Sequence, residues 1–236
     1  MQQTTAPWLV YALVVFCLVS GTASWCSPLD ENRQDPSGDA VINLSQPERE
    51  GEVSIEATLE NRRSIRQYPG GTVTQNQLAQ LLWAAQGITD PRGFRTAPSA
   101  GATFPLEVLV VVGNVSGVPA GVYRYEPDEH RIVQTLSGDL REQLAAASLG
   151  QDWVRQADAS IVITAVPGRT TARYGERGVR YVHMEVGHAA QNVYLQAYAL
   201  DMGTVVVGAF QDAEVRTVLQ LPEEEEPMAI LPVGRL

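Results

Sequence analysis

Two hydrophobic patterns are mixed along the chain from residue 52 onward, and together they predict both strands and helices. Short runs rich in β-branched residues have the length of buried strands, and they occupy residues 106–112, 160–166, 204–210 and 228–234. Residues 121–127 and 131–136 flank a polar stretch and predict a β-hairpin. The strand signals do not alternate regularly with helices, which argues against a doubly wound fold.

Apolar residues at helical spacing predict a helix between Thr74 and Gly87, because Thr74 and Gln77 can form a capping box and Gly87 is suited to end the helix. Further helices are predicted at residues 139–149, 179–201 and 212–219. Residues 179–201 are apolar or small on nearly every side, so this helix is expected to run through the core. The fold class is therefore α+β, a sheet packed by helices.

The N-terminus differs from the rest of the chain. Trp8 to Val19 form an unbroken apolar run followed by small residues, a length typical of a signal peptide. We therefore expect residues 1–26 to be a signal peptide or N-terminal membrane anchor, residues 27–51 a polar linker, and residues 52–236 the folded domain. Export or anchoring follows if this holds. A misassigned start or a buried N-terminal helix, with a cytoplasmic protein, is the alternative.

Charge and composition narrow the function classes. Lys and Arg total 17 against 27 Asp and Glu, a net charge of −10, and the sequence contains no lysine. An acidic chain of this kind is a poor candidate for nucleic acid. Schiff-base chemistry and Walker-type phosphate loops both need a lysine and are excluded. The two cysteines, Cys17 and Cys26, precede the predicted domain, so that domain can form neither a disulfide nor a thiolate metal site.

Three arginines and a serine nevertheless gather in five residues, Arg62, Arg63, Ser64 and Arg66 around one isoleucine. Arg62 and Arg66 share a side whether the segment is extended or helical. Such a pair with a hydroxyl suits a terminal phosphate, through charge-assisted hydrogen bonds. The alternative is a solvated helix end.

Two other stretches lack large side chains. Pro98, Ser99, Ala100 and Gly101 begin a loop that would let a flat ligand approach the backbone, and Val207 with Gly208 ends a predicted strand. Each could equally be a tight connection between elements.

Five motifs in order now carry a resemblance: R-R-S-x-R-x-[FY], P-S-A-G-A-T-x-P, E-x-G-H-x-x-Q-N-x-x-L-Q-A, G-T-V-V-V-G-A-F and P-V-G-R. From about residue 52 to the end, the chain resembles the nitroreductase-like flavoprotein family, specifically its SagB/ThcOx-type azoline-oxidase branch. The resemblance implies a sandwich with a mixed or antiparallel sheet, and a homodimer with FMN at its interface. It implies these cofactor-binding residues: Arg62, Arg63, Ser64, Arg66, Pro98, Ser99, Ala100, Gly101, Val207, Gly208 and Arg235.

The resemblance also implies a ping-pong cycle in which hydride passes through flavin N5 to or from a small organic substrate, with NAD(P)H as one candidate donor. Arg173 and Tyr174 match a Lys-Tyr pair of azoline-oxidising members. Arginine stays protonated in proteins, so Arg173 cannot be a general base. Tyr174 could donate a proton, orient substrate or simply pack. Peptide azoline oxidation and a non-catalytic flavin-binding module therefore remain as alternatives.

No metal site is expected. His183, Glu185 and His188 are spaced at offsets of two and five, which places them on different faces of a helix. The run of four glutamates at 223–226 is expected to be a solvated turn. Trp83 and Trp153 are interpreted as core or interface packing.

Overall fold

The computed structural model describes residues 40–236, so the predicted signal or anchor segment and residues 27–39 of the predicted linker lie outside the described residues. The main sheet has seven strands, and every neighbouring pair is antiparallel. Their spatial order is β1 (Val41–Asn43), β6 (Arg131–Ser137), β5 (Gly121–Glu126), β3 (Leu106–Val112), β7 (Ala159–Ala165), β9 (Glu226–Arg235) and β8 (Met202–Thr204). A separate pair, β2 (Val73–Thr74) and β4 (Val115–Ser116), is parallel.

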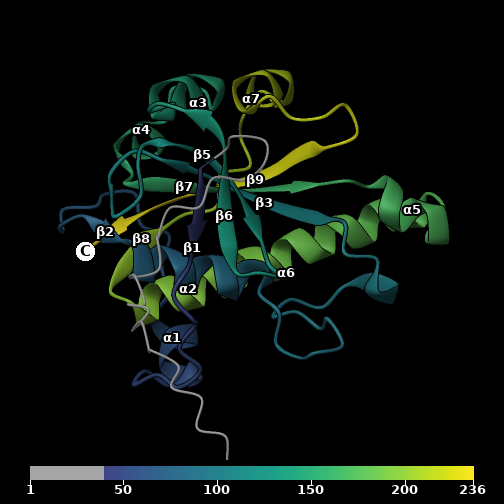
Figure 1. Cartoon of the computed structure of the whole chain (residues 1–236), viewed down its shortest axis with the longest axis horizontal. Coiled ribbons are helices and arrows are strands. Elements are labelled where there is room, and N and C mark those ends of the chain that lie inside the picture. Colours follow the sequence, from purple (N-terminus) through teal and green to yellow (C-terminus); the bar gives the residue numbers. More distant parts are fainter. Residues whose placement is uncertain (1–39) are drawn as a thin grey trace, which may run out of the picture. The chain divides into compact units, whose positions relative to one another are not determined.

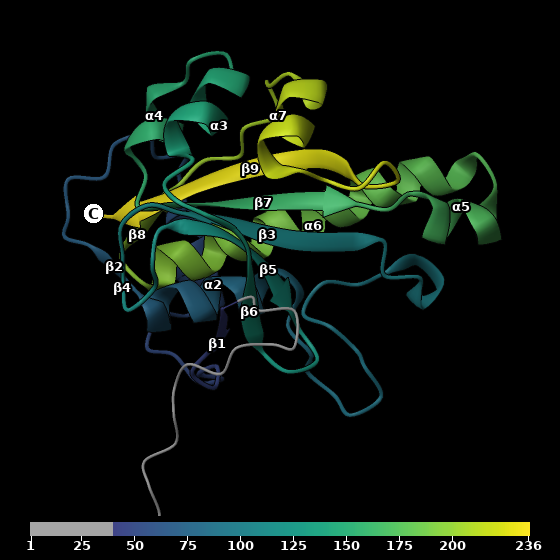
Figure 2. The ribbon, with the colours of Figure 1, turned by 45° about the horizontal axis from the view of Figure 1, so that its top comes forward.

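Helices cover both faces of this sheet (Figure 1, Figure 2). The helices packed on one face are α2 (Gln75–Gln86) and α6 (Arg177–Ala199), and those on the other are α3 (Arg141–Ala147), α4 (Asp152–Gln156) and α7 (Asp212–Leu219). Side chains of β3 alternate between the two cores: Val108 and Val110 face the α2 and α6 side, and Leu109 and Val111 the other. The central strands are therefore buried on both faces, as their continuous apolar sequence predicts.

Most of the predicted elements are confirmed. The strand at 106–112, the hairpin and the helix at 212–219 are present, and Thr74 and Gln77 form the predicted capping box of α2. The short helices α1 (Ile55–Asn61), α4 and α5 (Gly168–Tyr174), the 3-10 turn at Ala100–Ala102 and strand β1 were not predicted. Each spans only a few residues, which is too short for an apolar period to emerge.

The strand predicted at 204–210 is largely wrong, and the reason lies in its neighbour. β8 ends at Thr204, paired with Val233, and only an isolated bridge joins Val207 to Ile230. The same register places Val205 opposite Pro232, which has no N–H for the ladder. Val206 donates its N–H to the Tyr194 hydroxyl instead, at 2.9 Å. The chain therefore leaves the sheet where the sequence favours a strand.

Helix α6 is buried on one face only. Val182, Val186, Ala189 and Val193 lie in the core, whereas residues 183, 184, 187, 188 and 191 are exposed. The prediction that it is surrounded by core is thus wrong for the single chain. Within residues 40–236, α6 and the other helices fall short of the combined length and apolarity that a membrane span requires.

The predicted linker at 27–51 is wrong for residues 40–44, whereas residues 45–51 lie outside any helix or strand. Val41, Ile42 and Leu44 are buried, and β1 pairs with β6. His130 fixes the residues that follow: its main-chain oxygen accepts the Leu44 N–H at 3.1 Å, and its Nε2 lies 2.8 Å from the Ser45 carbonyl oxygen. The folded domain therefore begins before residue 52.

His130 is expected to make stability depend on pH. Burial lowers its pKa, and the neutral ring satisfies both neighbours, since Nε2–H donates to Ser45 while Nδ1, 2.8 Å away, accepts from the Tyr125 hydroxyl. The unfolded chain takes up the proton more readily, so this contribution is present above about pH 6.5 and lost as the pH falls below it. Urea midpoints at pH 7.5 and 5.5 measure this loss, and it should be smaller in His130→Asn. An equal fall in the urea midpoint of the wild type and of His130→Asn would contradict this role of His130.

Candidate functional site

The arginine-rich segment, residues 62–70, lies along β8, the last strand of the sheet, and the end of β9. The Ile65 N–H donates to the Thr204 carbonyl at 2.9 Å in β8, and the Gly70 N–H donates to the Arg235 carbonyl at 3.1 Å in β9. Two glycines of the sheet permit this approach: a Cβ at Gly203 would lie 2.7 Å from the Ile65 side chain, and one at Gly234 would lie 2.5 Å from Tyr68. The segment is thus held in an extended path by main-chain hydrogen bonds and close packing.

Two arginines of this segment are stacked on aromatic rings. The Arg62 guanidinium carbon lies 5.0 Å from the centre of the Tyr194 ring on α6, and that of Arg66 lies 5.4 Å from the Trp153 ring on α4. Among the described residues, neither Arg62, Arg63 nor Arg66 forms a salt bridge. A guanidinium stacked by its face keeps its N–H edge available for an anion.

The third arginine behaves differently. Arg63 donates from Nη1 to the carbonyls of Glu60 and Arg62, both at 2.9 Å, and so helps to end helix α1. Arg62 and Arg66 have different aromatic partners, on α6 and α4, which pack on opposite faces of the sheet, so the pairing of the two guanidiniums on one side stays a prediction. A small cavity of about 100 Å³ is lined by Arg62, Arg63 and Tyr194, among others.

Tyr194 joins two of the predicted binding segments. Its hydroxyl lies 2.9 Å from the Ser64 hydroxyl and accepts the Val206 N–H, also at 2.9 Å. Beyond Val206, the Val207 side chain is buried in the core, whereas Gly208 is exposed and a Cβ placed there would meet nothing within 4 Å. Gly208 therefore offers an open stretch of main chain two residues beyond Val206, which Tyr194 links to Ser64.

Arg235 is brought to the same segment from the far end of the sequence. Its carbonyl accepts the Gly70 N–H, and an Nη atom of its guanidinium lies 3.8 Å from a Cβ built at Gly71. Arg235 Nε is buried and has no hydrogen-bond partner within residues 40–236. A buried N–H of a charged group without a partner is costly, so this atom marks a place for an acceptor.

The predicted small-residue loop lies beside α5 and the N-terminal half of α6. The Ala100 N–H donates to the Glu185 carboxylate at 2.8 Å, and the Ser99 hydroxyl accepts the Phe104 N–H at 2.9 Å. Glu185 is only 4% exposed, and burial raises the pKa of its carboxyl group. Pro98 begins this loop and is exposed. Glu185 was not predicted as a site residue, because nothing in the sequence indicates that its carboxylate holds a loop.

Arg173 and Tyr174 meet this loop at Gly101. Arg173 donates to the Gly101 carbonyl at 3.0 Å. Gly101 has a φ of 60°, which favours glycine, and a methyl group there would overlap the Tyr174 hydroxyl. Tyr174 also packs edge-on against Tyr181, with ring centres 5.2 Å apart. The candidate catalytic pair and the candidate ring-binding loop are therefore in contact.

His183, Glu185 and His188 have different surroundings on α6. His183 and His188 are exposed, while Glu185 is buried under the loop. No group of acidic, histidine or cysteine residues suited to a metal ion is found within residues 40–236.

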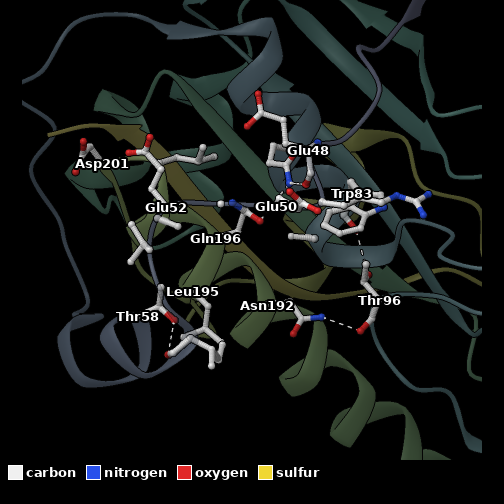
Figure 3. A pocket seen from close by; sticks show the side chains of 18 residues that line it. Glu48, Glu50, Glu52, Thr58, Trp83, Thr96, Asn192, Leu195, Gln196 and Asp201 are labelled. Atoms are coloured by element: carbon white, nitrogen blue, oxygen red, sulfur yellow. Dashed lines mark hydrogen bonds between the residues drawn. The ribbon is translucent and has the colours of Figure 1, made fainter.

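A cavity of about 930 Å³ contains none of these site residues (Figure 3). It lies between residues 48–58, α2 and the C-terminal half of α6. Its lining includes the acidic residues Glu48, Glu50, Glu52 and Asp201 together with Trp83 and Leu195. The Gln80 amide holds one wall by exchanging two hydrogen bonds of 2.9 Å with the main chain of Glu48. Four carboxylates make this cavity unsuited to a phosphate.

Comparisons with known proteins agree on one family. A model described as the nitroreductase family matches residues 59–235. A candidate nitroreductase of Methanocaldococcus jannaschii is 50% identical over 195 residues, covering 83% of this chain and 97% of that protein. The crystal structure of a candidate nitroreductase from Ralstonia eutropha JMP134 has a TM-score of 0.73 at 31% identity, over 83% of this chain and 89% of that one. A trifolitoxin-processing protein of Rhizobium leguminosarum bv. trifolii is 31% identical over 147 residues, covering 60% of this chain and 39% of that protein.

Proposed function

Since this chain belongs to the nitroreductase family, we propose that it is an FMN-dependent oxidoreductase that transfers hydride to or from a small organic substrate. Members of the family usually bind FMN, and the chain has residues that fit it. The observation that carries the proposal is the pair of stacked arginines, Arg62 and Arg66. Neither forms a salt bridge within the described residues, although the chain has an excess of acidic residues.

The remaining site residues fit the same cofactor. The unpartnered Nε of Arg235 and the Ser64 hydroxyl add donors near the arginine segment, where the FMN phosphate would be held. The main chain of Ser99 to Gly101 and of Gly208 would lie against the flat ring. A Cβ at Gly208 would meet nothing within 4 Å, whereas the side of Gly101 where a Cβ would point is occupied by Tyr174 and Arg173. When bound, FMN supplies hydride transfer through its ring. The chain supplies position, charge and exclusion of water.

Tyr174 is the described side chain best placed to act beside the ring-binding loop. Its hydroxyl lies against Gly101, and Arg173 is fixed to the same loop through the Gly101 carbonyl. We assign Tyr174 the role of orienting substrate or donating a proton, and Arg173 the role of holding the loop. A peptide azoline as substrate is less well supported, because Arg173 stands where a lysine would be needed and cannot accept a proton.

A second copy of the chain is part of the proposal. The loop contacts α6 at Glu185 and the arginine segment contacts it at Tyr194, nine residues or about 13 Å apart along the helix axis. On this part of α6, residues 184, 187, 188 and 191 form an exposed face, in which Met184 is 51% exposed. This face would be covered in a symmetric dimer, which would bring the loop of one chain toward the arginines of the other.

The test uses the purified full chain incubated with FMN and separated from free flavin. We expect roughly one FMN per chain, with absorbance bands that lose their fine structure when the protein is denatured. Sedimentation should give the mass of a dimer. After reduction by NAD(P)H or dithionite, a nitroaromatic or quinone acceptor should reoxidise the bound flavin much faster than it reoxidises free FMN.

The outcomes separate the alternatives. A folded chain that takes up no FMN would overturn the proposal. Bound flavin that is reoxidised no faster than free FMN would indicate a flavin-binding module without turnover. Oxidation of a thiazoline-containing peptide faster than of small acceptors would favour the azoline-oxidase alternative.

A further inference from the structure

The Tyr194 side chain connects the arginine segment to the stretch beyond β8. It receives the Val206 N–H at 2.9 Å, lies 2.9 Å from the Ser64 hydroxyl, and supports the Arg62 guanidinium on its ring at 5.0 Å. It is half-buried on α6. None of the sequence motifs points to it, because a tyrosine in a long helix is ordinarily a packing residue.

The chemistry of the two hydroxyl groups decides which of them donates in the Tyr194–Ser64 hydrogen bond. The Tyr194 oxygen already accepts a main-chain N–H, and that bond polarises its own O–H into a better donor. A phenol is also a stronger donor than the aliphatic hydroxyl of serine, which is the better acceptor of the two. The favoured order is therefore Val206 N–H to Tyr194 O–H to the Ser64 oxygen. In this order the Ser64 hydrogen is released to donate to a third group.

We propose that Tyr194 is a positioning residue for the phosphate of FMN: it turns the Ser64 hydroxyl into a donor and holds the Arg62 guanidinium flat, so that both present hydrogens to one anion. The inference rests on the proposed function and adds to it a residue that acts through Ser64 and Arg62. This role predicts an effect on FMN that riboflavin does not share. Loss of the Tyr194 hydroxyl weakens binding of the phosphate-bearing flavin and leaves binding of riboflavin, which has the same ring and no phosphate, unchanged.

The experiment compares the dissociation constants of FMN and riboflavin, measured by quenching of flavin fluorescence, in the full-length wild type and in Tyr194→Phe. The variant keeps the ring under Arg62 and loses only the hydroxyl. We expect FMN to bind about tenfold more weakly, the effect of roughly one hydrogen bond to a charged group, and riboflavin to change by less than about twofold.

Two further single variants, a control and a change at the partner hydroxyl, accompany Tyr194→Phe. Tyr198→Phe is the matched control, because Tyr198 lies one turn further along α6 and its hydroxyl has no hydrogen bond within residues 40–236; it should match the wild type. Ser64→Ala changes an exposed side chain and should weaken FMN binding by a similar factor. The double variant Tyr194→Phe/Ser64→Ala should be little worse than either single one, since both act through one hydroxyl.

The inference and the proposed function fail in different ways. A wild type that binds no flavin overturns both. A wild type that binds FMN, with Tyr194→Phe binding it equally well, overturns only the inference. Equal weakening of FMN and riboflavin in Tyr194→Phe also overturns it, because the hydroxyl would then maintain the general structure and not the phosphate site.

Discussion

Replacing both Arg62 and Arg66 by alanine is expected to weaken FMN binding by at least about 100-fold, because two charge-assisted hydrogen bonds of about 1.5 kcal/mol each are lost. The fold should persist, since neither guanidinium forms a salt bridge in the described part of the chain and the segment is held by main-chain hydrogen bonds to Thr204 and Arg235. Fluorescence titration gives the affinity, and circular dichroism verifies the fold.

Each single variant should show an intermediate loss, since each arginine has its own aromatic support on Tyr194 or Trp153. Arg49→Ala is the matched control: Arg49 is an exposed arginine on the acidic cavity, and its removal changes net charge by the same unit as either single variant. If Arg49→Ala weakened FMN binding as much as Arg62→Ala does, the loss would come from overall charge. The assignment of Arg62 to the FMN phosphate would then be wrong.

Replacing Glu225 by alanine is expected to lower the free energy of unfolding by about 2 to 3 kcal/mol, below the full cost of breaking a buried ion pair because Arg124 is partly exposed. Glu225 is only 3% exposed. Its two carboxylate oxygens lie 3.2 and 2.8 Å from the Arg124 guanidinium, and it also accepts from the Thr164 hydroxyl. Removing it would leave Arg124 with Glu107, at 3.5 Å, as its remaining acidic neighbour.

The adjacent exposed residue provides the control. Glu224→Ala removes the same charge from the same run of glutamates and should change stability by less than about 0.5 kcal/mol. Urea denaturation of the three proteins measures the difference. Equal midpoints for the two variants would show that Glu225 contributes no more than a solvated charge.

Glu225 also illustrates what the sequence could not predict. Four consecutive glutamates favour a solvated turn, and three of them are exposed as expected. Glu225, the third of the run, is buried because Arg124 and Thr164 reach it from β5 and β7, 101 and 61 residues away in sequence. A local pattern contains no information about partners so distant.

The same limit separates the predicted from the unpredicted parts of the fold. Strand β3 and helix α2 were predicted closely, because their signals are local: an apolar run, and a capping box at Thr74 and Gln77. The run at 204–210 has an equally good local signal, but Pro232 and Tyr194, from β9 and α6, decide its structure. Strand β1 is a strand because β6 pairs with it.

For the candidate site, the sequence indicated the segments but not what holds them. The motifs around Arg62, Ser99, Gly208 and Arg235 were visible as unusual composition or as a family resemblance. Tyr194, Trp153 and Glu185 position them through a hydroxyl, an indole face and a buried carboxylate. Tyrosine, tryptophan and glutamate are all common in helices, so the sequence alone does not mark these three positions. Their role follows only from their contacts.

The path of residues 62–70 along β8 and β9 has a consequence for solubility. β8 ends the sheet, and an uncovered outer strand can pair with the strand of another molecule and begin aggregation. The Ile65 N–H occupies the Thr204 carbonyl, and the charged arginines on either side of Ile65 discourage a further strand from adding. The segment that would hold the cofactor thereby also protects the sheet edge, so substitutions within it affect aggregation as well as binding.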